Sequence, residues 1–246
     1  MQIGQYELHS IETGRFALDG GAMFGIVPKS LWNKLNPSDD ENRIEMALRL
    51  LLIMDDKHKI LVDTGIGTKF SEKYQEIYKI DQSKYNLTSS LEKYNLETKD
   101  ITDVILTHLH LDHVGGAVYN EGNKHKLTFP NAAHYVQKKH HEWALKPSKK
   151  DIGSFIREDF KSIEDEGKLR LVDGYAKILP DIDVIISDGH SIGLQLVKIS
   201  DGINTLIYCS DLIPFTSHIR VPYIPSYDID PLTTIEEKAF GNLQKI

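Results

Sequence analysis

Four residues that can bind metal ions fall within six positions of the chain. In the segment 107–113, His108 and His110 are two apart, and Asp112 and His113 follow directly. Side chains two apart in an extended strand share a face, so both imidazoles would point the same way. Neutral imidazoles and carboxylates are the ligands that zinc prefers, whereas calcium needs mostly oxygen ligands. The segment therefore predicts a zinc site, with manganese, iron or cobalt as the alternatives.

Two more residues, His190 and Asp211, extend this set. Each directly follows a predicted strand, 183–187 and 204–209, as the first four follow the strand at 101–107. Strand ends on one rim of a sheet can converge on one site, and a carboxylate such as that of Asp211 can bridge two ions. The alternative for each residue is a solvated position in a loop. We expect both to be metal ligands, which makes the site large enough for a pair of ions.

The elements that must position these ligands alternate along the chain. Apolar runs bounded by turn residues predict strands at 47–54, 59–63, 101–107, 183–187, 193–199 and 204–209. Helical composition predicts helices at 89–94, 135–145, 152–166 and 232–246, of which 135–145 and 152–166 would be outer helices or a lid. No internal repeat or long linker interrupts the pattern. We therefore expect one α/β domain that covers residues 1–246.

The composition narrows the class of protein. The chain has 246 residues, 40% hydrophobic and 26% charged, as is usual for a globular enzyme. Its net charge of −7 opposes binding to nucleic acid or to an anionic membrane. There is neither a run of about 18 apolar residues nor a signal-peptide pattern, so we expect a cytoplasmic protein. The lone cysteine, Cys209, cannot form an internal disulfide, and we expect it to be a small buried residue.

The order of these motifs resembles the metallo-β-lactamase superfamily. His-x-His-x-Asp-His at 108–113 is followed by Gly-His at 189–190 and Ser-Asp at 210–211, so the resemblance covers nearly the whole chain. Residues 19–29 (Asp-Gly-Gly-Ala-Met-Phe-Gly-Ile-Val-Pro-Lys) and Trp32 are similar to the branch of N-acyl homoserine lactonases, YtnP-like proteins and methyl parathion hydrolases. The YtnP-like quorum-quenching lactonases look nearest. The resemblance implies a four-layer αββα sandwich.

The resemblance also implies which residues would bind each ion. The first ion would be bound by His108, His110 and His190. The second would be bound by Asp112 and His113. Asp211 would bridge the two ions. Asp63 would orient one of the ligand histidines, a kind of support that metal sites need. The alternative for Asp63 is an ordinary turn residue at a strand end.

The chain departs from the family pattern in two places. The family has a further histidine on the second metal, on a strand after the final helix, whereas this sequence ends at Ile246 within that helix. We therefore expect a sandwich without its C-terminal strand, and either a truncated chain or an incomplete second site. His218 is a candidate substitute, but its neighbours are more typical of a substrate loop. Pro214 and Phe215 stand near Asp211, where the lactonases have a tyrosine that contacts the lactone carbonyl. This difference leaves the substrate open.

The remaining histidines have no ligand spacing with the motif. We expect them on the surface: His9, His58, His125, His134, His140 and His141. The basic run at 138–141 is expected to be a solvated helix face rather than an anion-binding site.

These residues together predict a hydrolase that opens lactone rings, such as those of N-acyl homoserine lactones. Two zinc ions would generate a bridging hydroxide that attacks the ring carbonyl, and Asp112 would deliver a proton to the leaving oxygen. The alternatives are phosphotriester or thioester hydrolysis, as in methyl parathion hydrolase or glyoxalase II, and an inactive, truncated metal-binding domain. The expected partner is a small-molecule ester or lactone. The apolar segment at 23–32 would suit an acyl chain, the core or a homodimer contact.

Overall fold

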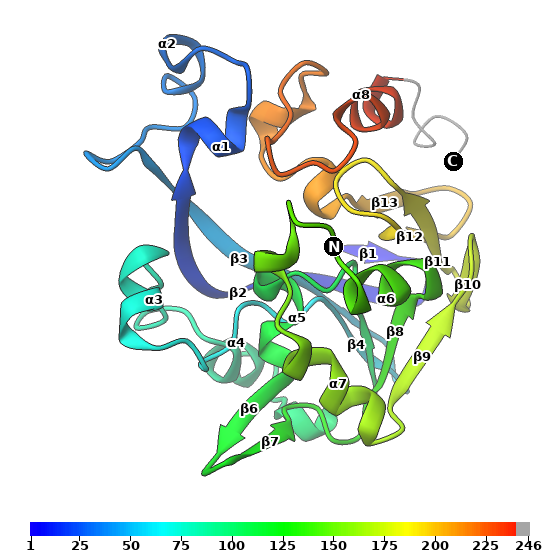
Figure 1. The fold of residues 1–246 in the computed structure, drawn as a ribbon. Coiled ribbons are helices and arrows are strands. Elements are labelled where there is room, and N and C mark those ends of the chain that lie inside the picture. The colour runs from blue at the N-terminus through cyan, green and yellow to red at the C-terminus, as the bar shows by residue number, and fades with distance from the viewer. Residues whose placement is uncertain (240–246) are drawn as a thin grey trace.

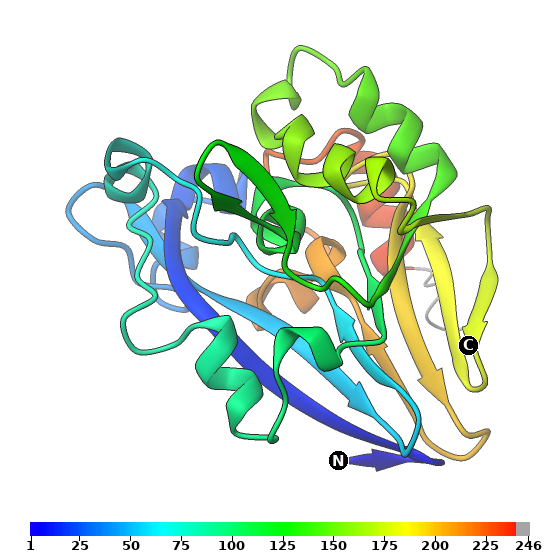
Figure 2. The same cartoon turned by 90° about the horizontal axis from the view of Figure 1, so that it is seen from below.

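The structure, a computed structural model, describes residues 1–239. Its larger sheet has seven strands, which Figures 1 and 2 show running across the molecule. Their order is β1 (Gln2–Ile3), β2 (Tyr6–Asp19), β3 (Arg43–Met54), β4 (Lys59–Val62), β5 (Asp103–Ile105), β8 (Ala133–Gln137) and β9 (Leu169–Val172). Pairs from β1 to β4 are antiparallel, and pairs from β4 to β9 are parallel. The parallel part matters for function because it aligns the carboxyl ends of β4 and β5.

A second sheet packs face to face on the first. It is antiparallel, in the order β10 (Ala176–Leu179), β11 (Ile182–Ser187), β12 (Leu194–Ser200) and β13 (Thr205–Tyr208). On β3, Leu51 packs with Val184 and Val197 in the core between the sheets, whereas Leu52 belongs to the core on the opposite face. Successive strand residues point to opposite faces, so a continuous apolar run such as 50–53 fills both cores.

Helices cover the outer faces of the two sheets. The core outside the first sheet includes Leu91 of α4 (Leu87–Glu92) together with Phe160 and Ile163 of α7 (Arg157–Asp165). On the other side, α8 (Pro231–Ala239) lies beside the second sheet in Figure 1, and Glu237 accepts a hydrogen bond from Ser187 Oγ at 2.6 Å. The layers are thus helix, sheet, sheet and helix. This arrangement confirms the expected αββα sandwich.

The remaining elements are short. The helices are α1 (Gly20–Phe24), α2 (Lys29–Trp32), α3 (Glu72–Ile77), α5 (Leu111–Val114) and α6 (Lys138–Leu145). β6 (Val118–Glu121) and β7 (Lys124–Leu127) form a separate hairpin. Short 3-10 turns occur at Thr98–Asp100, Gly115–Ala117, Ile152–Ser154, Ser210–Leu212 and Thr216–Ile219.

Some of the predicted helices differ from the structure in part. The predicted helix at 152–166 begins only at Arg157, because Ile152–Ser154 is a 3-10 turn and residues 155 and 156 are extended. The predicted helix at 135–145 is wrong in its first turn, because residues 135–137 belong to β8, which pairs with β5 and β9. The buried position between two parallel strands outweighs the helical composition that follows. The predicted helix at 232–246 agrees with α8 as far as Ala239, and residues 240–246 lie outside the described part of the chain. No helix among residues 1–239 is both long and apolar enough to cross a membrane.

Candidate metal centre

Four strand ends meet at the centre. Asp63 follows β4, the segment 108–113 follows β5, His190 follows β11 and Asp211 follows β13. The loops after β4 and β5 are joined directly: Thr64 N–H donates to His113 O, and Gly116 N–H donates to Gly65 O, both at 2.8 Å. A Cβ on Gly116 would lie 2.0 Å from Thr64 O, so glycine permits this close backbone approach.

Three imidazoles converge on one side of the centre. His110 Nδ1 lies 3.0 Å from His108 Nε2 and 3.3 Å from His190 Nε2. All three residues are buried. A neutral imidazole has one ring nitrogen with a free lone pair, so three rings that converge this closely can bind a shared metal ion.

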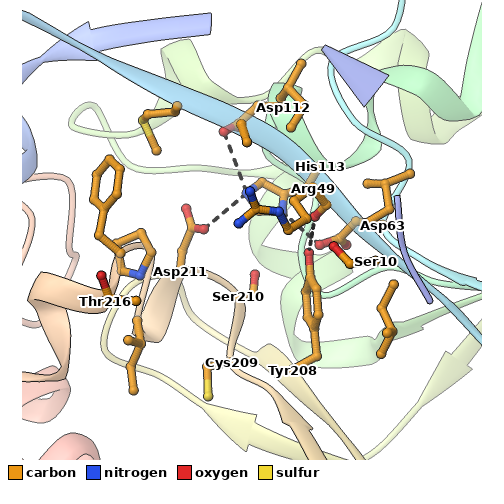
Figure 3. A pocket seen from close by; sticks show the side chains of 18 of the residues that line it. Ser10, Arg49, Asp63, Asp112, His113, Tyr208, Cys209, Ser210, Asp211 and Thr216 are labelled. Atoms are coloured by element: carbon orange, nitrogen blue, oxygen red, sulfur yellow. Dashed lines mark hydrogen bonds and ion pairs between the residues drawn. The ribbon is translucent and has the colours of Figure 1, made fainter. Parts of the chain in front are cut away.

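Carboxylates surround His113 on the other side, as Figure 3 shows. His113 Nε2 lies 3.2 Å from Asp211 Oδ1 and 3.6 Å from Asp112 Oδ2. The second oxygen of Asp211, Oδ2, lies 3.3 Å from His190 Nε2. Asp211 therefore presents one oxygen to each half of the cluster. The structure brings together all six residues that the sequence predicts as ligands.

Buried aspartates orient two of these histidines. Asp63 Oδ2 lies 2.9 Å from His113 Nδ1, and Asp63 Oδ1 accepts from Thr107 N–H at 2.8 Å. Asp228 Oδ1 lies 2.9 Å from His190 Nδ1. A carboxylate at Nδ1 favours the tautomer with Nδ1 protonated and leaves Nε2 free to bind a metal. The geometry fits the predicted role of Asp63, whereas Asp228 is a second supporting residue that the sequence did not indicate.

The electrostatics suit a cation. Burial lowers the pKa of His108 and His110 well below the usual range, and neighbouring imidazoles lower it further, so both rings are neutral. Burial alone would raise the pKa of Asp211, but the nearby imidazoles, led by that of His113, hold it below its ordinary value. The neutral imidazoles of His108 and His110 next to the ionised carboxylate of Asp211 are donors expected for zinc.

Comparisons with known proteins agree with this geometry. The family model described as "Metallo-beta-lactamase superfamily" matches residues 50–241. The chain belongs to the metallo-β-lactamase superfamily. With the histidine and aspartate cluster in place, this membership makes the protein a metal-dependent hydrolase, and the resemblance seen in the sequence is confirmed.

Its relatives include lactonases. The chain is 32% identical over 199 residues to the N-acyl homoserine lactonase AttM of Azorhizobium caulinodans, an alignment that covers 73% of this chain and 68% of that protein. It is 30% identical over 146 residues to AttM of Agrobacterium fabrum, covering 55% of this chain and 50% of the relative. The chain thus spans about half to two thirds of the length of these curated relatives. These matches support the quorum-quenching lactonase branch.

Solved structures share the fold. A probable metal-dependent hydrolase from Staphylococcus aureus is 31% identical, with a TM-score of 0.89 over 97% of this chain and 84% of that one. AidC, described as a dizinc quorum-quenching lactonase in complex with the product N-hexanoyl-L-homoserine, has a TM-score of 0.77 over 97% of this chain and 83% of its own, at 24% identity. At that identity, AidC supports the fold alone.

Several histidines outside the motif contradict the surface prediction. His134, His140 and His141 are buried. His140 Nε2 accepts from Leu109 N–H, and its Nδ1 donates to Ile192 O, both at 2.8 Å. This imidazole therefore fixes the backbone between His108 and His110, a role that depends on tertiary contacts and has no signal in the local sequence.

The alternative ligand His218 lies away from the cluster. It is buried, donates from Nε2 to Met23 O at 2.8 Å and stacks on Phe24 with ring centroids 4.7 Å apart. It joins the loop after Asp211 to α1. The basic run at 138–141 is likewise only half solvated, because Lys138 and Lys139 are exposed whereas the two histidines are buried.

Two hollows open on the cluster. A cavity of about 450 Å³ is lined by His110, His190, Asp112 and Asp211, and its lining also includes apolar residues: Phe16, Leu18, Met23, Met46, Leu111, Pro214 and Pro225. A wider groove of about 620 Å³ reaches His113 between β3 and β13 and is the pocket of Figure 3. Lys150 is the one lysine or arginine among the described residues that line the first cavity.

Proposed function

We propose that this protein opens the ring of N-acyl homoserine lactones with two bound zinc ions. His108, His110 and His190 would hold one ion, Asp112 and His113 the other, with Asp211 between them. The observation that carries the proposal is the 450 Å³ cavity, whose lining combines residues of the histidine and aspartate cluster with apolar side chains. An N-acyl homoserine lactone has a polar ring, which would lie at the cluster, and an acyl chain, which would lie against the apolar side chains. The lactonase names of the sequence relatives support the same substrate class.

Different residues of the chain would have different roles in the hydrolysis. Divalent ions at this site would polarise the ring carbonyl and lower the pKa of water. Asp112 lines the cavity within the cluster, so its carboxylate could take the proton from the attacking water and pass it to the leaving ring oxygen. The apolar side chains exclude water and hold the acyl chain. The product is a ring-opened hydroxy acid.

The test is ring opening by the zinc-loaded protein. N-hexanoyl homoserine lactone should be hydrolysed, with acid release measured by a pH-sensitive dye, and Asp112→Asn should reduce kcat by about 100-fold or more. The matched control is Asp103→Asn, a buried aspartate on β5 that contacts Thr102 and Tyr135 instead of the cluster. Its activity should match that of the unchanged protein.

The alternative substrates are tested in the same assay. A phosphotriester and a thioester, at matched concentration, should both give a lower kcat/KM than the lactone. Faster hydrolysis of either would replace the lactonase proposal. A protein that binds two ions and turns over none of the three substrates would contradict it.

A further inference from the structure

We propose that Thr234 on α8 acts through Asp228 as a positioning residue that sets the metal affinity of the three-histidine site. The inference rests on the proposed role of His190 as a ligand. It concerns a helix whose first residue lies 41 positions after His190 in the sequence.

The contacts form a chain of two hydrogen bonds. Thr234 Oγ1 donates to Asp228 Oδ2 at 2.8 Å, and Asp228 Oδ1 accepts from His190 Nδ1 at 2.9 Å. None of the three residues is more than 3% exposed. Both carboxylate oxygens of Asp228 are thus engaged by side chains, which fixes the plane of the carboxylate and, through it, the plane of the imidazole.

That orientation decides where the free nitrogen points. With Nδ1 donating to Asp228, the lone pair of His190 Nε2 faces His110 Nδ1 at 3.3 Å and Asp211 Oδ2 at 3.3 Å. A rotation of the ring would carry Nε2 out of this cluster. Supporting partners of this kind commonly change metal affinity by about 10- to 100-fold.

The helix is held tightly enough to serve this purpose. Asp230 N–H donates to Gly189 O at 2.9 Å, and Ile229 N–H donates to His190 O at 3.1 Å. A Cβ on Gly189 would lie 2.3 Å from Thr234 Oγ1, so the first turn of α8 rests directly on the turn that carries His190. Movement of α8 would therefore be transmitted to the ligand.

A third contact links Asp228 to a loop that lines the cavity. Lys150 Nζ donates to Asp228 O, and Lys150 lines the cavity that opens on His190. Asp228 thus joins three parts of the molecule: the ligand turn after β11, the helix α8, and the loop between α6 and α7.

The experiment compares two neighbouring threonines. Thr234→Val keeps the shape of the side chain and removes the hydroxyl, and Thr234→Ser restores it. Thr233→Val is the control, because Thr233 lies in the same turn of α8 and its hydrogen bond to Asp230 Oδ1 is donated by the backbone N–H, which valine keeps. Zinc affinity of the 246-residue chain is measured by competition with a chromophoric chelator, and the melting temperature of each metal-free variant is recorded.

We expect Thr234→Val to weaken binding of the zinc ion at the three-histidine site by about 10-fold or more, with affinity recovered in Thr234→Ser and unchanged in Thr233→Val. Equal affinities in Thr234→Val and the unchanged protein, or equal losses in the two valine variants, would overturn the inference and leave the proposed function standing. Failure of the unchanged protein to bind zinc would overturn both. Asp228→Asn, measured in the same way, provides a second test if Thr234→Val does not fold.

Discussion

Three imidazoles and Oδ2 of Asp211 converge on one half of the cluster, whereas the other half combines His113 with Asp112 and Oδ1 of Asp211. The first half is buried, with His108 0% exposed. The second half borders the groove between β3 and β13, and Asp112 is partly exposed.

This difference teaches how the two ions would be held. Zinc is four-coordinate in closed sites, and a catalytic zinc has three protein ligands and one open position. The three-histidine half offers four protein donors and thus resembles a closed site. The His113 half offers three among the described residues, so one position would be open to water or substrate. We therefore expect a tightly held ion next to a weakly held one.

The largest effect should come from removing one imidazole from each half in turn. His110→Ala should remove the tightly held ion and reduce kcat/KM by more than about 100-fold, because losing a supporting residue alone commonly costs 10- to 100-fold. His113→Ala should lose activity but retain one zinc ion per chain. Elemental analysis after gel filtration measures both. Retention of one ion by both variants, or by neither, would contradict the comparison.

The unchanged protein should show the same inequality. We expect a chelator to remove one zinc ion at a lower concentration than the other, with apparent affinities at least about tenfold apart, which corresponds to about 1.4 kcal/mol. Activity should fall as the first ion leaves, because the weaker half has the open position. A single release step for both ions would show that the halves are equivalent.

A smaller effect on zinc affinity should follow from substitution of Asp63, the aspartate that supports His113. Asp63→Asn replaces the acceptor at His113 Nδ1. It should lower the affinity for the weakly held ion by about 10-fold and leave the affinity for the tightly held ion unchanged. Asp103→Asn, a buried substitution on β5, is the control. The same chelator competition reports both ions, and a loss confined to the tighter ion would refute the assignment of Asp63.

The sequence indicated the cluster because its residues follow strand ends closely. Four of the six candidate ligands lie within residues 108–113, and His190 and Asp211 each come just after an apolar strand. Asp63 also ends a predicted strand, but its supporting role was expected only from the resemblance to the family. A motif of this kind is local, so its spacing survives in the sequence.

The rest depended on contacts between distant segments. Asp228 lies 38 positions after His190, and His140 meets the backbone of Leu109 across 31 positions. The long strand β2 alternates buried and exposed residues, but polar residues among its buried positions, such as Thr13, weaken the strand pattern. Tertiary packing decides these features, and single-sequence patterns do not record it.

The smallest effect concerns a buried imidazole outside the cluster. His134 on β8 is 0% exposed, and neither ring nitrogen makes a hydrogen bond of good geometry with the described residues. Burial lowers its pKa to about 4, which a contact with the backbone of Ala132 offsets only in part. In the cluster, by contrast, the ring nitrogens face one another and carboxylates. His134→Leu should therefore raise the free energy of unfolding at pH 7.5 by about 1 kcal/mol, because an unpaired buried polar group is removed.

The gain should grow in acid. The pKa of His134 is lower in the folded protein than its unfolded value of about 6.5. Below pH 6.5 the unfolded chain therefore takes up a proton first, and the free energy of unfolding falls as the pH falls towards 4. At pH 5 the unchanged protein should lose about 2 kcal/mol through His134, a loss that His134→Leu avoids. Urea unfolding of both proteins measures the difference, with the exposed His125→Gln as the control. Equal gains at pH 7.5 and pH 5 would show that the pKa of His134 is the same in the folded and unfolded states. Other buried histidines titrate in both proteins, so their contributions cancel in the comparison.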